Sequence, residues 1–361
     1  MGPKIKTQNK QKDGSCITLL KSLIAIPSYS GREKAAADLL ECHLLEQGLQ
    51  PVRHNNNIWL LPVNYSQQKE NVLLNGHIDT VQPSGEWSYN PHQPVESGGK
   101  IFGLGSNDAG AALVCLLDTF MHFQKQQMPF NLIFSATAEE ETGGDLGIQS
   151  ILDELPGISL GIMGEPTSMH MATAERGLLV IDGIATGTVT HAALENPDNA
   201  ILKAIKYLHT IQDLHFDKRS AILGDVRITL SQVHGGNQHN VTPSQCRFIL
   251  DIRLNERYSP QEVMDTLQQK GDCTLRARSL NKKASAIPRD HPIVQSAKNL
   301  DVPTYGSQTL SNMACVPFPC IKIGPGQSSR SHQPDEYICR KEIETGRQQY
   351  IHLINQYISL L

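Results

Sequence analysis

The chain has 361 residues, of which 39% are hydrophobic and 19% charged, so it has enough apolar material for packed cores. Its formal net charge of -4 excludes the strongly basic field that draws proteins to nucleic acid or to anionic membranes. We therefore expect a small-molecule partner, and neither nucleic acid nor membrane. Because this length exceeds what one hydrophobic core usually organises, we expect two domains.

The N-terminal segment and the cysteines predict a cytoplasmic protein. The first fifteen or so residues are basic and polar, so we expect a flexible tail there. Lys21 interrupts the apolar stretch at 17–26, which is unlike a secretory signal, and no apolar run is long enough to span a bilayer. The eight cysteines form no C-x-x-C pair, so we expect reduced thiols in a reducing compartment.

Periodicity in the first half predicts helices alternating with buried strands. Apolar residues at helical spacing predict a helix over about 31–48, with Ser30 as its N-cap and Gly48 as its end. Continuous apolar segments predict buried strands over 71–75, 131–137 and 159–163, and a helix over about 109–124. This alternation is typical of an α/β fold with a mainly parallel sheet.

From about residue 178 the pattern changes to that of a second, self-contained unit. The expected order is strand, helix, strand, strand, helix, strand, over 178–187, 197–210, 225–233, 245–254, 259–269 and 273–280. This β-α-β-β-α-β order is the ferredoxin-like arrangement, which folds around its own core. We therefore expect an inserted domain over 176–282 and a discontinuous first domain over 1–175 and 283–361. A strand with a glycine loop at 320–327 and a helix at about 340–359 complete the first domain.

Side chains that can bind metal follow the predicted buried strands at their carboxyl ends. They are His77 and Asp79, then Glu139, Glu140 and Glu141, then Glu165, and last His332 in the loop after the strand near 320. In an open α/β sheet the loops at this edge converge on one crevice, where ligand sites form. We therefore expect these side chains to meet.

Asp108 comes from a further segment, the glycine-rich loop GLGSNDAGA. Its glycines allow the backbone to turn sharply just before the next helix, and a carboxylate in that place can reach two metal ions. Two imidazoles and several carboxylates suit zinc, although cobalt or manganese could occupy the same donor set.

Five separated motifs, in this order, are similar to those of a known family. They are Gly76-His77-Ile78-Asp79-Thr80 with Trp87, the GLGSND loop ending at Asp108, Glu139-Glu140-Glu141-Thr142-Gly143-Gly144, Gly164-Glu165-Pro166-Thr167, and the late His332. Together they resemble the acetylornithine deacetylase, succinyl-diaminopimelate desuccinylase and glutamate carboxypeptidase family over nearly the whole chain. The resemblance implies that His77 and Glu165 bind one zinc ion, that Glu141 and His332 bind another, and that Asp108 bridges them.

The resemblance also implies catalytic and substrate-binding roles. Asp79 would orient His77 by accepting a ring N–H, and Glu140 would be the general base in hydrolysis of an amide. His191 would stabilise the oxyanion, and the matching family histidine reaches in from a partner subunit, which implies a homodimer with a dimerising inserted domain. Arg253 and Asn240 would contact the substrate carboxylate.

Two departures from the family pattern leave assignments open. The usual Asp-Glu-Glu reads Glu139-Glu140-Glu141 here. The assignments of the general base and of the metal ligand within this triplet therefore stay open by one residue. The residues before His191, Thr188-Val189-Thr190, are also unusual.

Ordinary structural explanations compete with these roles. Asp108 could cap the following helix, the acidic triplet could be solvated, and Arg253 could face solvent from its strand. Glu165 could belong to an ordinary turn. A nucleotide-binding loop at Gly103 is disfavoured, because that fingerprint requires a glycine where Asp108 stands.

We therefore expect metal-dependent hydrolysis of an N-acyl amino acid, namely acetylornithine or acetylcitrulline in arginine biosynthesis. A succinyl-diaminopimelate or succinylornithine desuccinylase is the alternative, followed by a dipeptidase or carboxypeptidase. A metal-retaining binding module without turnover is the alternative outside enzymes.

Overall fold

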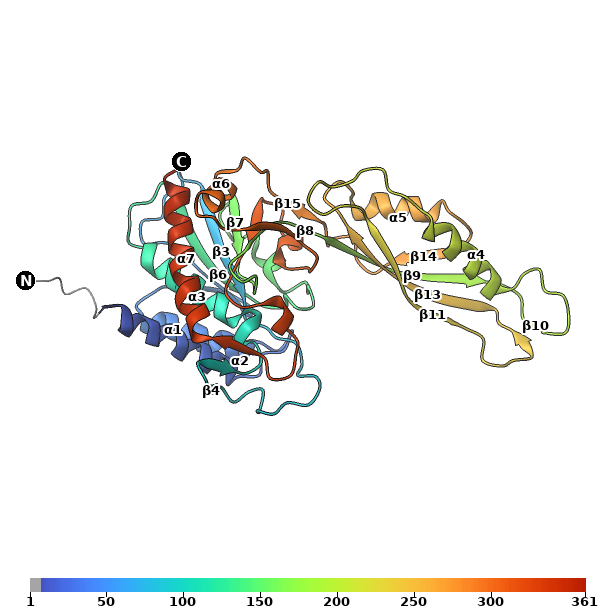
Figure 1. Cartoon of the computed structure of the whole chain (residues 1–361), viewed down its shortest axis with the longest axis horizontal. Coiled ribbons are helices and arrows are strands. Elements are labelled where there is room, and N and C mark those ends of the chain that lie inside the picture. The colour runs from blue at the N-terminus through green and yellow to red at the C-terminus, as the bar shows by residue number, and fades with distance from the viewer. Residues whose placement is uncertain (1–7) are drawn as a thin grey trace, which may run out of the picture. The chain divides into compact units, whose positions relative to one another are not determined.

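The computed structural model describes residues 8–361, with side chains from Cys16 onward, and divides into two compact units (Figure 1). The first unit runs to Thr173 and also contains Ile287–Tyr305 and Ser311–Leu361. The second contains Ala174–Ala286 and the short segment Gly306–Leu310, which the sequence had placed in the first domain. Among the described residues, no helix is both long and apolar enough to cross a membrane.

The largest sheet has nine strands, and its four central strands are parallel. These are, in spatial order, β6 (Asn131–Thr137), β3 (Asn71–His77), β7 (Leu160–Met163) and β17 (Cys320–Lys322). Every residue of these four strands is buried, as expected where both faces of a parallel sheet are covered. Antiparallel strands flank them: β1 (Val52–His54) and β2 (Asn57–Leu60) beside β6, and β8 (Met171–Glu175) and β15 (Ser285–Ala286) beyond β17. The ninth strand, β16 (Thr304–Ser307), pairs with β8.

Helices of the first unit cover the sheet, and α3 (Ala111–Phe123) packs against both the sheet and α7 (Arg340–Ile358) (Figure 1). The other helices are α1 (Gln8–Ile24), α2 (Lys34–Glu46) and α6 (Pro292–Asn299). Successive residues of a strand point to opposite faces, so Leu74 of β3 enters the larger core while Leu73 enters a smaller one beside Trp59. A separate antiparallel sheet contains β4 (Val95–Ser97), β5 (Lys100–Phe102) and β18 (Tyr337–Cys339).

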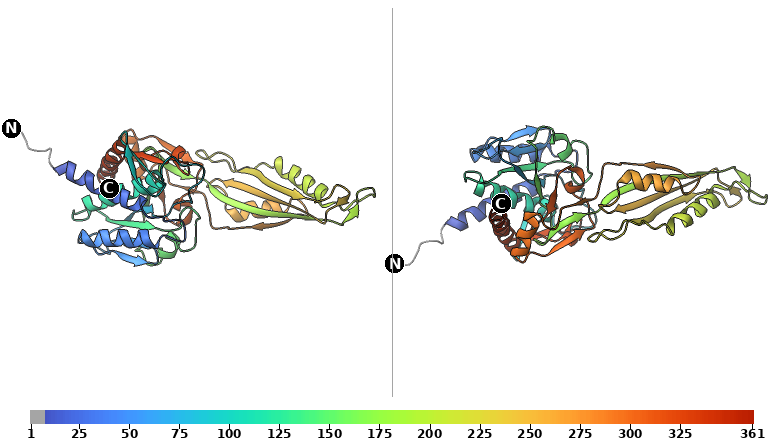
Figure 2. Two further views of the ribbon diagram at one scale, coloured as in Figure 1. Left: turned by 90° about the horizontal axis from the view of Figure 1, so that it is seen from below. Right: turned by 90° about the horizontal axis from the view of Figure 1, so that it is seen from above.

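The second unit is a four-stranded antiparallel sheet with two helices on it. In chain order its elements are β9 (Gly177–Thr186), α4 (Ala200–Gln212), β11 (Arg227–Gly235), β13 (Gln245–Leu254), α5 (Pro260–Gln268) and β14 (Thr274–Ala277). The spatial order β11-β13-β9-β14 is that of a ferredoxin-like fold, and β9 pairs with β13 along its whole length (Figure 2). A small ladder joins β10 (Thr190–His191) to β12 (Val241–Thr242).

The predicted α/β fold with a ferredoxin-like insertion is confirmed. Two local predictions are wrong. Helix α1 already begins at Gln8, so residues 8–15 are no tail, while the first seven residues of the predicted tail lie outside the described part of the chain. Ser30 does not cap α2, whose N-cap is Glu33, because the Ser30 hydroxyl donates instead to the Asp79 carboxylate at 2.7 Å.

Two neighbouring leucines of α2 allow a matched test of the core. Leu44 is fully buried in the larger core, whereas Leu45 is 55% exposed. We expect Leu44→Ala to lower the free energy of unfolding by about 2–5 kcal/mol, because it leaves a cavity, and Leu45→Ala to change it by less than about 0.5 kcal/mol. Urea unfolding followed by circular dichroism measures both. Equal effects of the two substitutions would contradict this packing of α2.

Candidate functional site

The adjacent parallel strands bring the predicted metal-binding side chains to one edge of the sheet. His77 is the last residue of β3, Glu140 and Glu141 follow β6, and Glu165 follows β7. His332 follows β17, just beyond the short helix η4 (Ser328–Arg330). All of these residues belong to the first unit. The position of each donor at the carboxyl end of its strand therefore explains why donors far apart in sequence meet.

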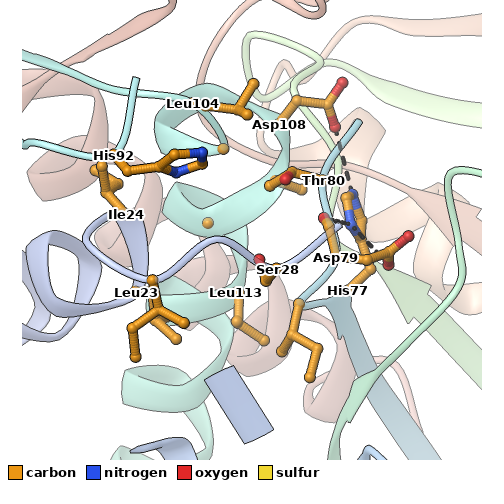
Figure 3. A pocket seen from close by; sticks show the side chains of 15 residues that line it. Leu23, Ile24, Ser28, His77, Asp79, Thr80, His92, Leu104, Asp108 and Leu113 are labelled. Carbon is orange, nitrogen blue, oxygen red and sulfur yellow. Dashed lines mark hydrogen bonds and ion pairs between the residues drawn. The ribbon is translucent and has the colours of Figure 1, made fainter. Parts of the chain in front are cut away.

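Asp108 lies between the two histidines, in the turn η1 (Ser106–Gly110) that precedes α3. Its Oδ1 is 3.4 Å from Nε2 of His77, a contact drawn as a dashed line in Figure 3, and its Oδ2 is 3.7 Å from Nε2 of His332. Each carboxylate oxygen thus faces a different imidazole. The N-cap of α3 is Gly110, so Asp108 does not cap that helix.

Each of the remaining donors lies close to one of the two histidines. Glu165 Oε1 lies 3.9 Å from Nε2 of His77, and Glu141 Oε2 lies 3.0 Å from Nε2 of His332. Donor atoms of His77, Glu140 and Glu165 all lie within 4.8 Å of one another, and so do those of His77, Asp108 and Glu141. The geometry therefore provides two overlapping groups of nitrogen and oxygen ligands.

Asp79 fixes the turn that carries two of the glutamates. Its carboxylate accepts the backbone N–H groups of Glu140 and Glu141, each at 3.0 Å. Nδ1 of His77 lies 2.8 Å from the main-chain carbonyl of Asp79 and 3.5 Å from its carboxylate. The nearer acceptor for the ring N–H is therefore the carbonyl, which differs from the expectation and still leaves Nε2 facing the other donors.

Glu139 points away from the donor groups, although it begins the acidic triplet. Its backbone is left-handed, with φ of 54°, and its side chain accepts the N–H of Leu146 at 3.0 Å. Its own N–H donates to the buried Glu33 at 3.2 Å. The triplet is thus divided: Glu139 has structural partners, while Glu140 and Glu141 turn toward the histidines.

These carboxylates are buried close to one another, and burial raises their pKa values. Desolvation, with the charge of Glu165, raises the pKa of Glu140 well above its ordinary value. Burial also raises the pKa of Glu165 to about 8, with a further contribution from Asp108. A multivalent cation would relieve this repulsion, and the imidazole and carboxylate donors suit zinc, cobalt or manganese. The residues therefore fit a metal site.

A cavity of about 20 Å³ borders His77, Asp79 and Asp108 on the side of α1 (Figure 3). Leu23, Ile24, Ser28, Thr80, His92 and Leu104 also line it. This volume suffices for about one water molecule. An acylated amino acid cannot bind there, so a substrate has to approach the donors from elsewhere.

Comparison with known proteins identifies the family. The model of peptidase family M20/M25/M40 matches residues 73–356, which is most of the chain. The chain belongs to this family. It is 28% identical to an acetylornithine deacetylase of Edwardsiella ictaluri, covering 95% of this chain and 98% of that relative. It is 27% identical to an acetylornithine deacetylase of Proteus mirabilis, covering 94% and 96%.

Solved structures of the M20 family share the fold of the whole chain. A metallo-carboxypeptidase of Sulfolobus solfataricus gives a TM-score of 0.75 at 14% identity, covering 95% of this chain and 99% of the other. A dinuclear metal binding peptidase of Bacillus subtilis gives 0.74 at 13% identity, covering 97% and 99%. The M20 chain described here is therefore a member of a hydrolase family that includes dinuclear metal-binding peptidases.

Three predicted site residues of this M20 member belong to the second unit. His191 in β10 pairs with Val241 in β12, the residue after Asn240. The main-chain carbonyl of Asn240 accepts the N–H of Ala192 at 2.9 Å. Nδ1 of His191 accepts the N–H of Ala193 at 3.1 Å. Arg253 pairs with Asp251 on the same strand through contacts of 2.7 and 3.1 Å. The structure therefore brings His191 and Asn240 together, and gives Arg253 a carboxylate partner of its own.

Glu336 is the main residue of the site region that the sequence reasoning missed. It is buried, and its carboxylate accepts three N–H groups of the loop that carries Asp108. Burial, with the charge of Asp108, raises the pKa of Glu336 to about 8. Its place four residues after His332 was visible in the sequence, but no pattern separated it from an ordinary acidic residue.

Metal uptake by this M20 protein should depend on pH. The contact with Glu141 raises the pKa of His332 to about 9, and burial raises that of Glu165 to about 8, so both hold protons at neutral pH. Because a metal binds deprotonated donors, we expect its binding to release protons and its affinity to rise from about pH 6.5 to about pH 9. Calorimetric titration in two buffers of different ionisation enthalpy counts the protons. A pH-independent affinity without proton release would contradict the expectation.

Proposed function

We propose that this M20 chain is a two-zinc deacetylase that hydrolyses the amide bond of an N-acyl amino acid, acetylornithine or acetylcitrulline. The observation that carries the proposal is Asp108, whose two oxygens face His77 and His332 separately at 3.4 and 3.7 Å. A carboxylate in that position is suited to bridge two metal ions. The acetylornithine deacetylase relatives support this choice of substrate. The resemblance found in the sequence implies a place in arginine biosynthesis.

The ligand assignment that we propose uses the contacts of each histidine. His77 and Glu165 would hold one zinc ion, and His332 and Glu141 the other, with Asp108 shared. Cobalt or manganese could replace zinc in the same donor set. A site that served only structure would be closed by its ligands, whereas the proposed assignment leaves Glu140, within 4.8 Å of the donor atoms of His77 and Glu165, to act as a base.

In the proposed reaction water adds across the amide. Zinc held by these donors would supply Lewis-acid polarisation of the amide carbonyl and of water. Glu140 removes a proton from the attacking water, whose oxygen bonds to the carbonyl carbon, and returns that proton to the nitrogen as the C–N bond breaks. Burial raises the pKa of Glu140, which brings it closer to the pH at which one group can both accept and return a proton.

We further propose a homodimer in which the partner's His191 stabilises the oxyanion and in which Asn240 and Arg253 bind the substrate carboxylate. Exposed apolar side chains of the second unit support dimerisation. Leu202 and Ile205 of α4 are 60% and 56% exposed, and Leu230 and Val233 lie on β11, an edge strand. A cytoplasmic location stays a prediction from the sequence.

The role of Glu140 can be tested against its neighbour. We expect Glu140→Gln to keep the metal and to lower kcat by about 10²- to 10⁴-fold, because an amide cannot accept the proton. Glu139→Gln should retain most activity, since the amide oxygen can still accept the N–H of Leu146. Metal content and kcat are measured for both variants. If Glu140→Gln stays active, the assignment of Glu140 as the base is wrong. If only Glu139→Gln is inactive, Glu139 is the base instead.

The reaction class is tested by amine release from a substrate panel with zinc and then with a chelator. We expect acetylornithine or acetylcitrulline to be hydrolysed, and the chelator to abolish turnover. Preference for succinyl-diaminopimelate or succinylornithine would favour a desuccinylase, and preference for dipeptides a dipeptidase. Tightly held metal without any turnover would favour the binding module.

A further inference from the structure

We propose that Glu336 is a positioning residue that sets the orientation of Asp108 toward the two histidines; this inference rests on the proposed metal site. The side chain of Glu336 is 2% exposed. Its Oε1 accepts the N–H groups of Asn107 and Asp108 at 2.8 and 2.9 Å, and its Oε2 accepts that of Gly105 at 3.1 Å. One buried carboxylate therefore satisfies three backbone donors of a single turn.

The turn is shaped to surround the carboxyl group of Glu336. Gly105 has φ of 76°, a left-handed conformation that lets nearby N–H groups converge on one point. A Cβ at this position would lie 2.6 Å from Cγ2 of Thr80. Both the left-handed backbone and this steric clash therefore exclude a larger residue. Each N–H of the turn would cost free energy if it stayed buried without an acceptor. The shape of the turn thus depends on the carboxylate that it surrounds.

Glu336 also joins two of the site-bearing segments. It lies four residues after His332, and its main-chain carbonyl accepts the N–H of Gly103 at 2.9 Å. The neighbouring Asp335 accepts the N–H groups of Ser88 and Tyr89 at 2.8 and 3.2 Å. The segment 332–336 therefore supplies one histidine and holds both the Asp108 loop and the loop after Trp87. Movement of Glu336 would change the separation of Asp108 and His332.

Glu336 acts through Asp108 and is not itself among the donors. Its two oxygens are occupied by the three N–H groups, and it lies in neither of the groups of possible metal ligands found among the described residues. Its expected effect is therefore on metal affinity. Residues that hold a ligand in place typically contribute about 10- to 100-fold to metal affinity.

Two conservative variants test this role. Glu336→Gln keeps the shape but turns an NH₂ group toward one of the three donors, and Glu336→Asp keeps the carboxyl group but is too short to reach all three. We expect both to bind zinc about 10- to 100-fold more weakly in competition with a chelating dye. Activity should return when zinc is added in excess, with KM for the substrate unchanged. Hydrogen exchange of residues 103–110 should become faster.

Glu262→Gln is the matched control. Glu262 also accepts a backbone N–H, that of Ser259 at 2.7 Å, but caps α5 in the second unit. This variant should lower the melting temperature without changing zinc affinity or exchange at 103–110. If the Glu336 variants likewise lose only melting temperature, the positioning role is overturned.

The same competition separates this inference from the proposed function. If the unmodified chain binds no zinc, the metal site and the inference are both overturned. If the unmodified chain binds zinc and the Glu336 variants bind it equally well, only the inference fails. Weaker binding by both variants, with normal binding by Glu262→Gln, supports it.

Discussion

The site depends on holding several negative charges together in a place where water cannot screen them. Burial raises the pKa of Glu140, Glu141 and Glu165, and each carboxylate adds to the repulsion felt by its neighbours. Such an arrangement persists only if the segments that carry the carboxylates are held in place and if a cation compensates their charge. The fold provides the first, and the donor set fits the second.

Three buried carboxylates accept backbone N–H groups of the segments that carry the ligands. Asp79 holds the turn of Glu140 and Glu141, Glu33 holds the preceding residue, and Glu336 holds the loop of Asp108. Each accepts N–H groups that would otherwise be unpaired in the interior. The ligand geometry is therefore set largely by hydrogen bonds from main-chain N–H groups to buried carboxylates, which leave little freedom to the side chains that follow.

The two units divide the proposed chemistry between them. The first unit holds all of the candidate metal ligands, and the second holds His191, Asn240 and Arg253. The second unit also presents an edge strand and an apolar helix face, features that suit association with another copy. A family fold shared at 13–14% identity with peptidases supports many substrates, so substrate choice has to be read from the residues and from activity.

The sequence by itself determined the α/β class, the ferredoxin-like insertion and the candidate donors, because strand periodicity and strand-end position are local properties. It could not find short strands such as β4, β5 and β18, whose apolar residues are too few to form a pattern. Only the tertiary structure decided that Glu139 turns away from the histidines and that Glu336 supports Asp108. Those facts depend on which backbone N–H groups meet a carboxylate far away in sequence, and no local pattern records that.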